Sequence, residues 1–288
     1  MFASGVAIGR IRTWGLGCME IKILGTAAAE GWPAVFCACE TCRRAREVGG
    51  KNIRSRASVQ FGPRYKIDLP PDTWYHEALL GFDLAQLSYL FITHSHGDHW
   101  SPKCLHYLVS PFSHGRSGPL NVYGSDSVIR LARERYGRYE GEAIVLNEVE
   151  PFVPVEAGDM LFTPVRATHM ADELCLNYVV SSNGAAVLYA CDTSWYPDDT
   201  WEFLEAGRLD AVISECTCGP HSGGTGHMDF ERLFAMQSRL EQSATIAPDG
   251  VFVATHFSHN VGLLHEELEH ILRGHGIRAA YDGMEITL

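Results

Sequence analysis

A segment rich in histidine and aspartate follows the apolar residues YLFI at positions 89–92. It reads THSHGDH, and within six residues it carries three imidazoles and one carboxylate, at His94, His96, Asp98 and His99. Alternation at the end of a strand sends His94 and His96 to one side, and a turn at Gly97 brings the next two side chains back. Imidazole nitrogen together with carboxylate oxygen suits zinc, manganese or iron(II). One short loop could therefore serve two adjacent cations.

Four further potential ligands share one placement, because each ends an apolar strand pattern. They are Asp68 after YKI, His169 after LFTPVRAT, Asp192 after AAVLYAC and His256 after VFVAT. Loops gather where strands end, and side chains placed there lie on one rim of a sheet. We expect these four residues to lie beside the segment at 94–99 and to supply what two metals would still need.

Short β-rich runs dominate the chain, with helical patterns between some of them. The predicted strands are 20–25, 57–61, 64–68, 89–93, 120–123, 161–167, 176–180, 185–190, 210–214 and 251–255. The predicted helices are 125–136, 199–206, 229–241 and 261–273. Strands in blocks with interspersed helices predict two sheets packed together and covered by helices.

Composition narrows the class of protein. The 288 residues are 46% hydrophobic and hold no linker rich in Pro, Gly or Ser, so we expect one domain over 19–288, with 1–18 as an N-terminal appendage and Met19 as the natural start. No apolar run is long enough to span a bilayer, and a net charge of −12 disfavours anionic membranes and nucleic-acid polymers. Nine cysteines, an odd number, and the lack of a secretory signal predict the reducing cytoplasm. The basic run at 43–56 is interpreted as a solvated face.

A second metal site is predicted near 37–42, where Cys37, Cys39 and Cys42 lie within six residues. Three thiolates need one more donor to close a tetrahedral zinc site. The candidates are His259, Cys216, Cys218 and His221. His259 is preferred, because it lies three residues after His256 on a loop that must be near the same rim.

The residues His94, His96, Asp98, His99, His169, Asp192 and His256 resemble the ligand set of the metallo-β-lactamase superfamily. The resemblance runs from about residue 20 to the C-terminus. It implies an α/β fold, the αββα sandwich of two mixed sheets covered by helices, with two divalent ions, Mn²⁺ or Zn²⁺. The implied ligands of one ion are His94, His96 and His169, and those of the other are Asp98, His99 and His256. Asp192 would bridge the ions, and Asp68 would steady a ligand from behind.

One difference from the best-known members and several likenesses to other members indicate the branch of that superfamily that the chain resembles. The best-known β-lactamases carry Cys where this chain has Asp192, which favours the broader hydrolase branch. The segments at 25–46 and 255–259 resemble the cyclic-phosphate phosphodiesterases of the carbon–phosphorus lyase pathway. That branch has a structural Zn²⁺, whose ligands here would be Cys37, Cys39, Cys42 and His259. It also has an Asn-His-x-Asp element with a proposed general acid, and this chain reads Gly-His-Met-Asp with the acid at His227.

The predicted function is hydrolysis of a small phosphodiester, most closely a ribose-type cyclic phosphate. A hydroxide bridging the two metals would attack, His227 would protonate the leaving alkoxide, and Asp98 and Asp192 complete the catalytic set. His221 is the alternative acid. The alternative functions are a lactonase or thioesterase, or a protein like those of the pyrroloquinoline-quinone pathway, which share the N-terminal pattern. The expected partner is a small phosphorylated substrate, neither a nucleic-acid polymer nor a membrane, and relatives imply a homodimer.

Overall fold

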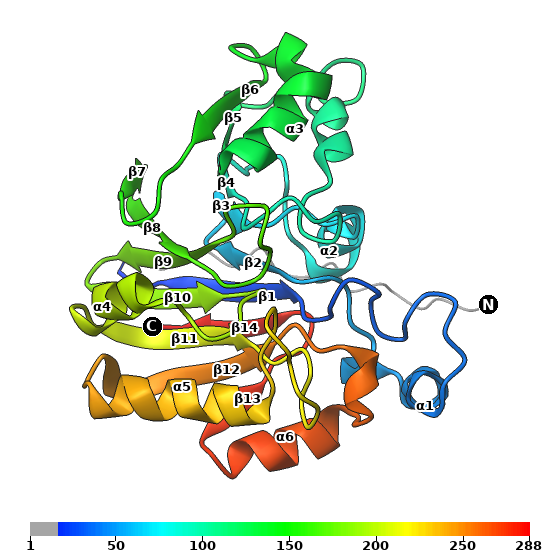
Figure 1. Cartoon of the computed structure of the whole chain (residues 1–288). Coiled ribbons are helices and arrows are strands. Elements are labelled where there is room, and N and C mark those ends of the chain that lie inside the picture. The colour runs from blue at the N-terminus through cyan, green and yellow to red at the C-terminus, as the bar shows by residue number, and fades with distance from the viewer. Residues whose placement is uncertain (1–16) are drawn as a thin grey trace.

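A computed structural model describes residues 17–288, so the predicted appendage lies almost wholly outside the described residues. Two seven-stranded sheets pack face to face, and helices lie on their outer sides (Figure 1). The predicted αββα sandwich of two mixed sheets is therefore confirmed. None of the helices within 17–288 combines the length and apolar character that crossing a bilayer requires.

The first sheet has the strand order β14-β1-β2-β3-β4-β5-β6. Its strands are β1 (Glu20–Gly25), β2 (Ser58–Phe61), β3 (Tyr65–Ile67), β4 (Tyr89–Phe91), β5 (Leu120–Gly124), β6 (Ile144–Glu148) and β14 (Met284–Thr287). Strands β3 to β6 run parallel, whereas β1 pairs antiparallel with both β2 and β14. The carboxyl ends of β3 and β4 consequently share one edge of this sheet.

The second sheet has the order β13-β12-β11-β10-β9-β8-β7. Its strands are β7 (Val155–Ala157), β8 (Met160–Arg166), β9 (Leu176–Ser182), β10 (Ala185–Ala190), β11 (Leu209–Glu215), β12 (Ile246–Thr255) and β13 (Ile277–Ala279). Strands β10 to β13 are parallel. The residues that follow β10, β11 and β12 therefore meet at one edge.

The core between the sheets is built from inward-facing aromatic and aliphatic side chains. Phe91 of β4 stacks on Phe162 of β8 with ring centroids 3.8 Å apart, and Tyr178 of β9 meets Phe91 edge-on. Each strand alternates, so that Tyr189 faces this core and Ala190 faces the helices outside. This packing fixes how the two site-bearing edges lie against each other.

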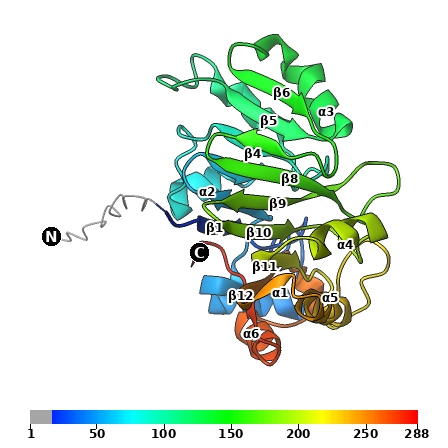
Figure 2. The same ribbon diagram turned by 90° about the vertical axis from the view of Figure 1, so that its left-hand side faces the viewer.

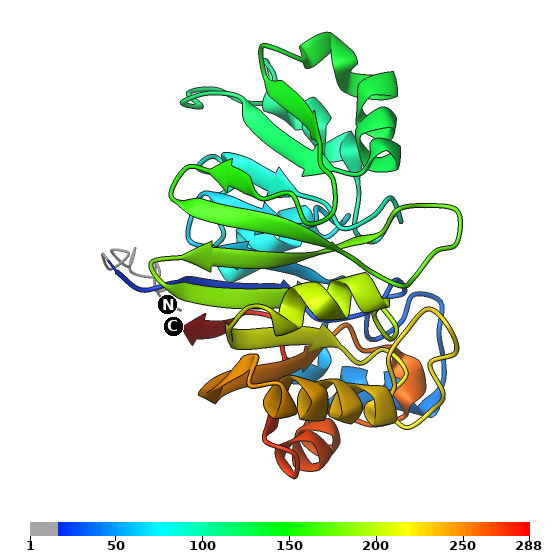
Figure 3. The same cartoon turned by 60° about the vertical axis from the view of Figure 1, so that its left-hand side comes forward.

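Within residues 17–288, six α-helices cover the outer faces. They are α1 (Glu40–Val48), α2 (Thr73–Leu80), α3 (Asp126–Tyr136), α4 (Asp198–Glu205), α5 (Phe230–Gln242) and α6 (His265–Arg273). Helix α3 packs Val128, Ile129 and Ala132 on the first sheet (Figure 2). Figure 3 shows the yellow-green α4 and the gold α5 along the second sheet, where Trp201 and Leu233 are buried.

The structure contains the elements that the sequence predicts, together with several that the sequence does not predict. All ten predicted strands and four helices are present, with shifted ends. The last helix was predicted from residue 261 but begins at His265, because Gly262 takes a left-handed φ of 76° that ends the short 3₁₀ turn His259–Val261. Helices α1 and α2 and strands β6, β7, β13 and β14 were not predicted.

Arg54 corrects the interpretation of the basic run as a solvated face. Its side chain is 3% exposed, and it donates to Thr26 Oγ1 at 2.8 Å and to the carbonyl of Ala280. Its guanidinium also lies 3.0 Å from His265 Nδ1. Arg54 therefore ties the loop after α1 to the segment after β13, and it contributes no charge to the surface.

Candidate functional site

The predicted active-site residues gather where strands of both sheets end. The segment at 93–99 follows β4, Asp192 follows β10, and His256 follows β12. Asp68, Asp192 and His256 have positive φ values of 64°, 54° and 55°. Left-handed backbone is uncommon for residues with a side chain and is costly unless the surroundings hold it. Here it turns the chain sharply, so that each functional side chain projects over the strand edge.

One group of donors combines three imidazoles with a carboxylate. The ligand atoms of His94, His96, His169 and Asp192 all lie within 4.8 Å of one another. His169 Nε2 is 3.2 Å from His96 Nδ1, and His94 Nε2 is 3.3 Å from Asp192 Oδ2. His94 Nε2 is buried and has no hydrogen-bond partner among the described residues. Buried polar atoms are normally satisfied, so this donor set fits a metal ion such as zinc or manganese.

The second group lies on the other side of Asp192. His99 Nε2 is 2.8 Å from Asp192 Oδ2 and 3.3 Å from His256 Nε2. Asp98 Oδ2 approaches His99 Nε2 to 3.3 Å and His256 Nε2 to 4.0 Å. The structure thus brings all seven predicted active-site ligands together, with Asp192 between the two groups. The Sγ atom of Cys191, which the sequence did not single out, also belongs to the second group.

Charges in this centre act strongly on one another because it is buried. Burial opposes ionisation of Asp192, yet His256 and His99 hold the pKa of this carboxyl well below its usual range. Burial lowers the pKa of His94 well below its usual value. A neutral imidazole beside an ionised carboxylate is the protonation state that a metal site requires.

Asp68 lies behind His99, as the sequence predicted. His99 Nδ1 donates to Asp68 Oδ2 at 2.7 Å, and the backbone N–H of Thr93 donates to Asp68 Oδ1 at 2.8 Å. This hydrogen bond orients the ring so that Nε2 faces Asp192, and although burial opposes the charged form, Asp192 and Asp68 raise the pKa of His99 well above its usual value. A carboxylate that holds a ligating imidazole in this way raises its basicity and orients its ring.

His227 reaches the centre from the loop before α5. Its Nδ1 lies 3.1 Å from Glu215 Oε1 and 3.4 Å from Asp192 Oδ1, and its side chain is 30% exposed. Burial opposes the charged form, but the hydrogen bond and charge of Glu215 raise the pKa of His227 to about 9. The alternative acid His221 is exposed and belongs to none of these groups. The geometry therefore favours His227 as the proton-carrying residue.

Glu215 is a functional residue that sequence reasoning missed. It is fully buried at the end of β11, and its carboxylate accepts from the backbone N–H groups of Thr193 at 2.7 Å and Met228 at 3.1 Å. These bonds lock the carboxylate beside His227. Glu215 follows the apolar run DAVIS just as Asp192 follows AAVLYAC. This shared placement is the sequence feature that could have identified Glu215.

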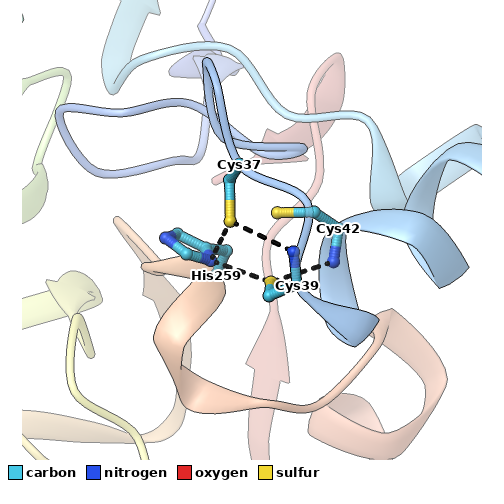
Figure 4. A group of neighbouring side chains, drawn as sticks. All are labelled: Cys37, Cys39, Cys42 and His259. Carbon is cyan, nitrogen blue, oxygen red and sulfur yellow. Dashed lines mark hydrogen bonds between the residues drawn. The ribbon is translucent and has the colours of Figure 1, made fainter.

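The predicted cysteine cluster is assembled at the N-terminus of α1 (Figure 4). The ligand atoms of Cys37, Cys39, Cys42 and His259 lie within 4.8 Å of one another, with His259 Nδ1 3.8 Å from Cys37 Sγ and 3.5 Å from Cys39 Sγ. His259 is therefore the histidine beside the thiols, and Cys216, Cys218 and His221 are not in this group. Three sulfurs and one nitrogen fit a tetrahedral zinc ion.

Backbone N–H groups support the thiols of this cluster. Cys39 N donates to Cys37 Sγ at 3.5 Å, Cys42 N to Cys39 Sγ at 3.4 Å, and Ala34 N to Cys42 Sγ at 3.3 Å. The bond from Cys42 N is the largest cause that lowers the pKa of Cys39 to about 6. Such bonds stabilise thiolates, which are the form that binds metal.

Comparison with known proteins agrees with this architecture. A family model described as a beta-lactamase superfamily domain matches residues 71–257, more than half of the chain. A diphosphatase from the PhnP family has a similar structure, with a TM-score of 0.72 and 22% identity, covering 93% of this chain and 97% of that one. Zn²⁺-bound PqqB from Methylobacterium extorquens is also similar, with a TM-score of 0.75 and 16% identity, covering 94% of this chain and 100% of that one.

Human tRNase Z, short form, is also similar, with a TM-score of 0.64 and 18% identity over 93% of this chain and 98% of that one. No curated protein sequence matched the chain. At these identities the solved structures show a shared fold, and the chemistry must be argued from the residues present.

Replacing Cys42 by Ser tests the zinc cluster. We expect the bound zinc to fall by one ion per chain and the free energy of unfolding to fall by about 3 kcal/mol or more, because metal binding at a structural site adds to folding stability. Metal analysis and denaturant unfolding measure the two effects. Cys216→Ser is the matched control, since Cys216 is equally buried and was the alternative ligand. Equal zinc contents in the two variants would contradict the assignment.

Proposed function

The chain belongs to the metallo-β-lactamase superfamily, and we propose that it is a metal-dependent hydrolase of small phosphodiesters, with a ribose-type cyclic phosphate as its substrate. The observation that carries this proposal is the pair His227 and Glu215 beside Asp192. A sugar alkoxide is a poor leaving group and needs a positioned acid. The thioesters that thioesterases cleave release a thiolate, which is far less basic and has less need of an acid.

The two groups of ligand atoms would hold the metal ions that supply the electrophilic part of the chemistry. Two divalent ions, Zn²⁺ or Mn²⁺, bound there would lower the pKa of a coordinated water and offset the charge that grows on the phosphoryl oxygens. Asp192 contacts imidazoles of both groups, and Asp68 orients the ring of His99. These residues fix the geometry before substrate arrives, so little reorganisation is needed during the reaction.

Differences in exposure define the face from which a substrate approaches. The side chains of His94, Asp192 and His256 are 2% exposed or less. His227 and Asp98 are 30% and 11% exposed, and they border the same carboxylate. A phosphoryl group that enters from this face would contact His227 first. This position suits a residue that donates a proton to the leaving oxygen.

The structural neighbours support a phosphoryl substrate without deciding it. The similar PhnP-family protein is described as a diphosphatase, and its substrate class comes to this chain as part of the proposal. The similarity to PqqB supports the alternative of a cofactor-pathway role. The His227–Glu215 pair favours the phosphodiesterase.

Hydrolysis of a ribose 1,2-cyclic phosphate by purified protein, followed by phosphorus NMR, tests the proposed function. We expect metal-dependent ring opening that is absent from Asp192→Ala, because Asp192 contacts donors of both groups. A protein that holds its active-site metals but shows no turnover would overturn the proposal. The lactonase, thioesterase and cofactor-pathway roles would then be tested instead.

Replacing His227 by Ala tests the acid. We expect alkyl phosphodiester hydrolysis to fall by about 10²–10⁴-fold, while p-nitrophenyl esters lose less than about tenfold, because nitrophenolate leaves without a proton. Steady-state rates on both substrates measure this. His221→Ala, on the same loop, should leave both rates unchanged. Equal losses on the two substrates in His227→Ala would contradict the acid role.

Replacing Glu215 by Gln tests how the acid is tuned. His227 donates its proton only when protonated, so activity is expected below its pKa and is lost as the pH rises through that value. Removing the Glu215 charge lowers the pKa of His227, so the alkaline limb of kcat should move to lower pH by about one unit or more. Glu202→Gln, an exposed change on α4, is the control. An unmoved limb in Glu215→Gln would count against this role.

A further inference from the structure

Cys191 lies between β10 and Asp192, and the predicted ligand set leaves it without a role. Along the strand, Tyr189 and Cys191 face the core between the sheets, whereas Ala190 faces the helices. Asp192 then turns the chain with its left-handed φ of 54°. Cys191 is therefore the last inward-facing side chain before the metal-binding edge.

The sulfur of Cys191 lies among the donors of only one half of the centre. Its Sγ is within 4.8 Å of the ligand atoms of His99, Asp192 and His256, and all four residues are buried. The other group contains three imidazoles and a carboxylate but no sulfur. The two halves of the centre therefore offer different chemistry to a metal.

Asp98 and Cys191 both lie beside His99 and His256, and they differ in their exposure to solvent. Asp98 Oδ2 lies 3.3 Å from His99 Nε2, and its side chain is 11% exposed. Cys191 has no exposed surface and sits on the floor formed by the two sheets. The thiol of Cys191 thus belongs to one group with His99, Asp192 and His256, and Asp98 approaches the two imidazoles of that group.

An independent observation also points to a cation here. Asp192 Oδ1 is buried and makes no hydrogen bond within the described part of the chain, although His256 Nε2 lies 3.2 Å and His227 Nδ1 3.4 Å away. Leaving a buried polar atom unsatisfied costs about 1–3 kcal/mol, and more for a charged group. This oxygen belongs to the carboxylate that the Cys191 group shares, so a bound ion would satisfy it.

We propose that Cys191 Sγ is a ligand of the ion held by Asp98, His99, Asp192 and His256, and that it makes this half of the centre select zinc over manganese. Thiolate is a soft ligand that favours zinc, whereas manganese prefers carboxylate and water. On binding, the thiol proton passes to the buffer and a sulfur–metal bond forms. The other half lacks sulfur, so its preference for zinc rests on its imidazoles alone.

Metal binding by Cys191→Ser tests the proposal, with Cys175→Ser as the matched control. Cys175 is also a buried free thiol, 2% exposed, but belongs to none of the donor groups. We expect zinc at one active-site position of Cys191→Ser to bind weaker by on the order of 10-fold or more, with manganese binding unchanged. Competition against a chromophoric chelator measures both. Cys175→Ser should bind both metals as the wild type does.

The cobalt spectrum gives a second, direct readout. The three cluster thiolates contribute equally in every variant, so loss of sulfur-to-cobalt charge-transfer absorbance in Cys191→Ser, at unchanged cobalt stoichiometry, belongs to Cys191. Unchanged absorbance and unchanged zinc affinity would overturn the proposal and leave Cys191 as a packing residue. Neither readout depends on the substrate, so a failed phosphodiesterase assay would not affect this result.

If Cys191→Ser does not fold, Cys191→Ala avoids burying a hydroxyl and is measured in the same way. X-ray absorption of the zinc-loaded wild type needs no substitution. With three zinc ions bound, the cluster alone gives an average of one sulfur per zinc. An average of one would overturn the proposal, and a higher value would support it.

Discussion

The carboxylate of Asp192 lies between imidazoles that come from both sheets. Its Oδ2 is 2.8 Å from His99, which follows β4 of the first sheet, and its Oδ1 is 3.2 Å from His256, which follows β12 of the second. Asp192 is 2% exposed, so water screens its charge less than at the surface, and the charges of the centre act on one another more strongly there. This one negative charge raises the pKa of His99 together with Asp68, and it raises the pKa of His227 together with Glu215.

Sheet packing makes that contact possible. Phe91 and Phe162 stack across the interface, and their strands, β4 and β8, run into the loops that carry His94 and His169. Because packed aromatic cores deform little, the distance between the two site edges is set by side chains that touch no ligand. Seven residues spread over more than 150 positions of the sequence are in this way held together in one centre.

The sequence predicted the sandwich and the metal ligands because both leave local patterns. Histidines spaced as in the segment at 94–99 are rare, and carboxylates or imidazoles after apolar runs are visible without a structure. Helix α1 was missed because only Cys42 and Ala45 are buried along it, which is too few for an apolar stripe. Strand β14 has four residues and becomes a strand only by pairing with β1, from the far end of the chain. Cys191 was missed because a cysteine in an apolar strand looks like any small core residue.

The cysteine cluster and the active centre each take one histidine from the loop that follows β12. His256 and His259 are three residues apart, and between them Phe257 N donates to Thr26 O at 2.9 Å and Ser258 N donates to Thr217 O at 3.2 Å. Thr217 Oγ1 in turn lies 2.8 Å from His256 Nδ1. Fastening His259 to the thiols at the start of α1 therefore also restrains the backbone that aims His256 at Asp192. A zinc ion in the cluster would act on the active centre through this restraint, by limiting how far the His256 loop can move, without contacting the substrate.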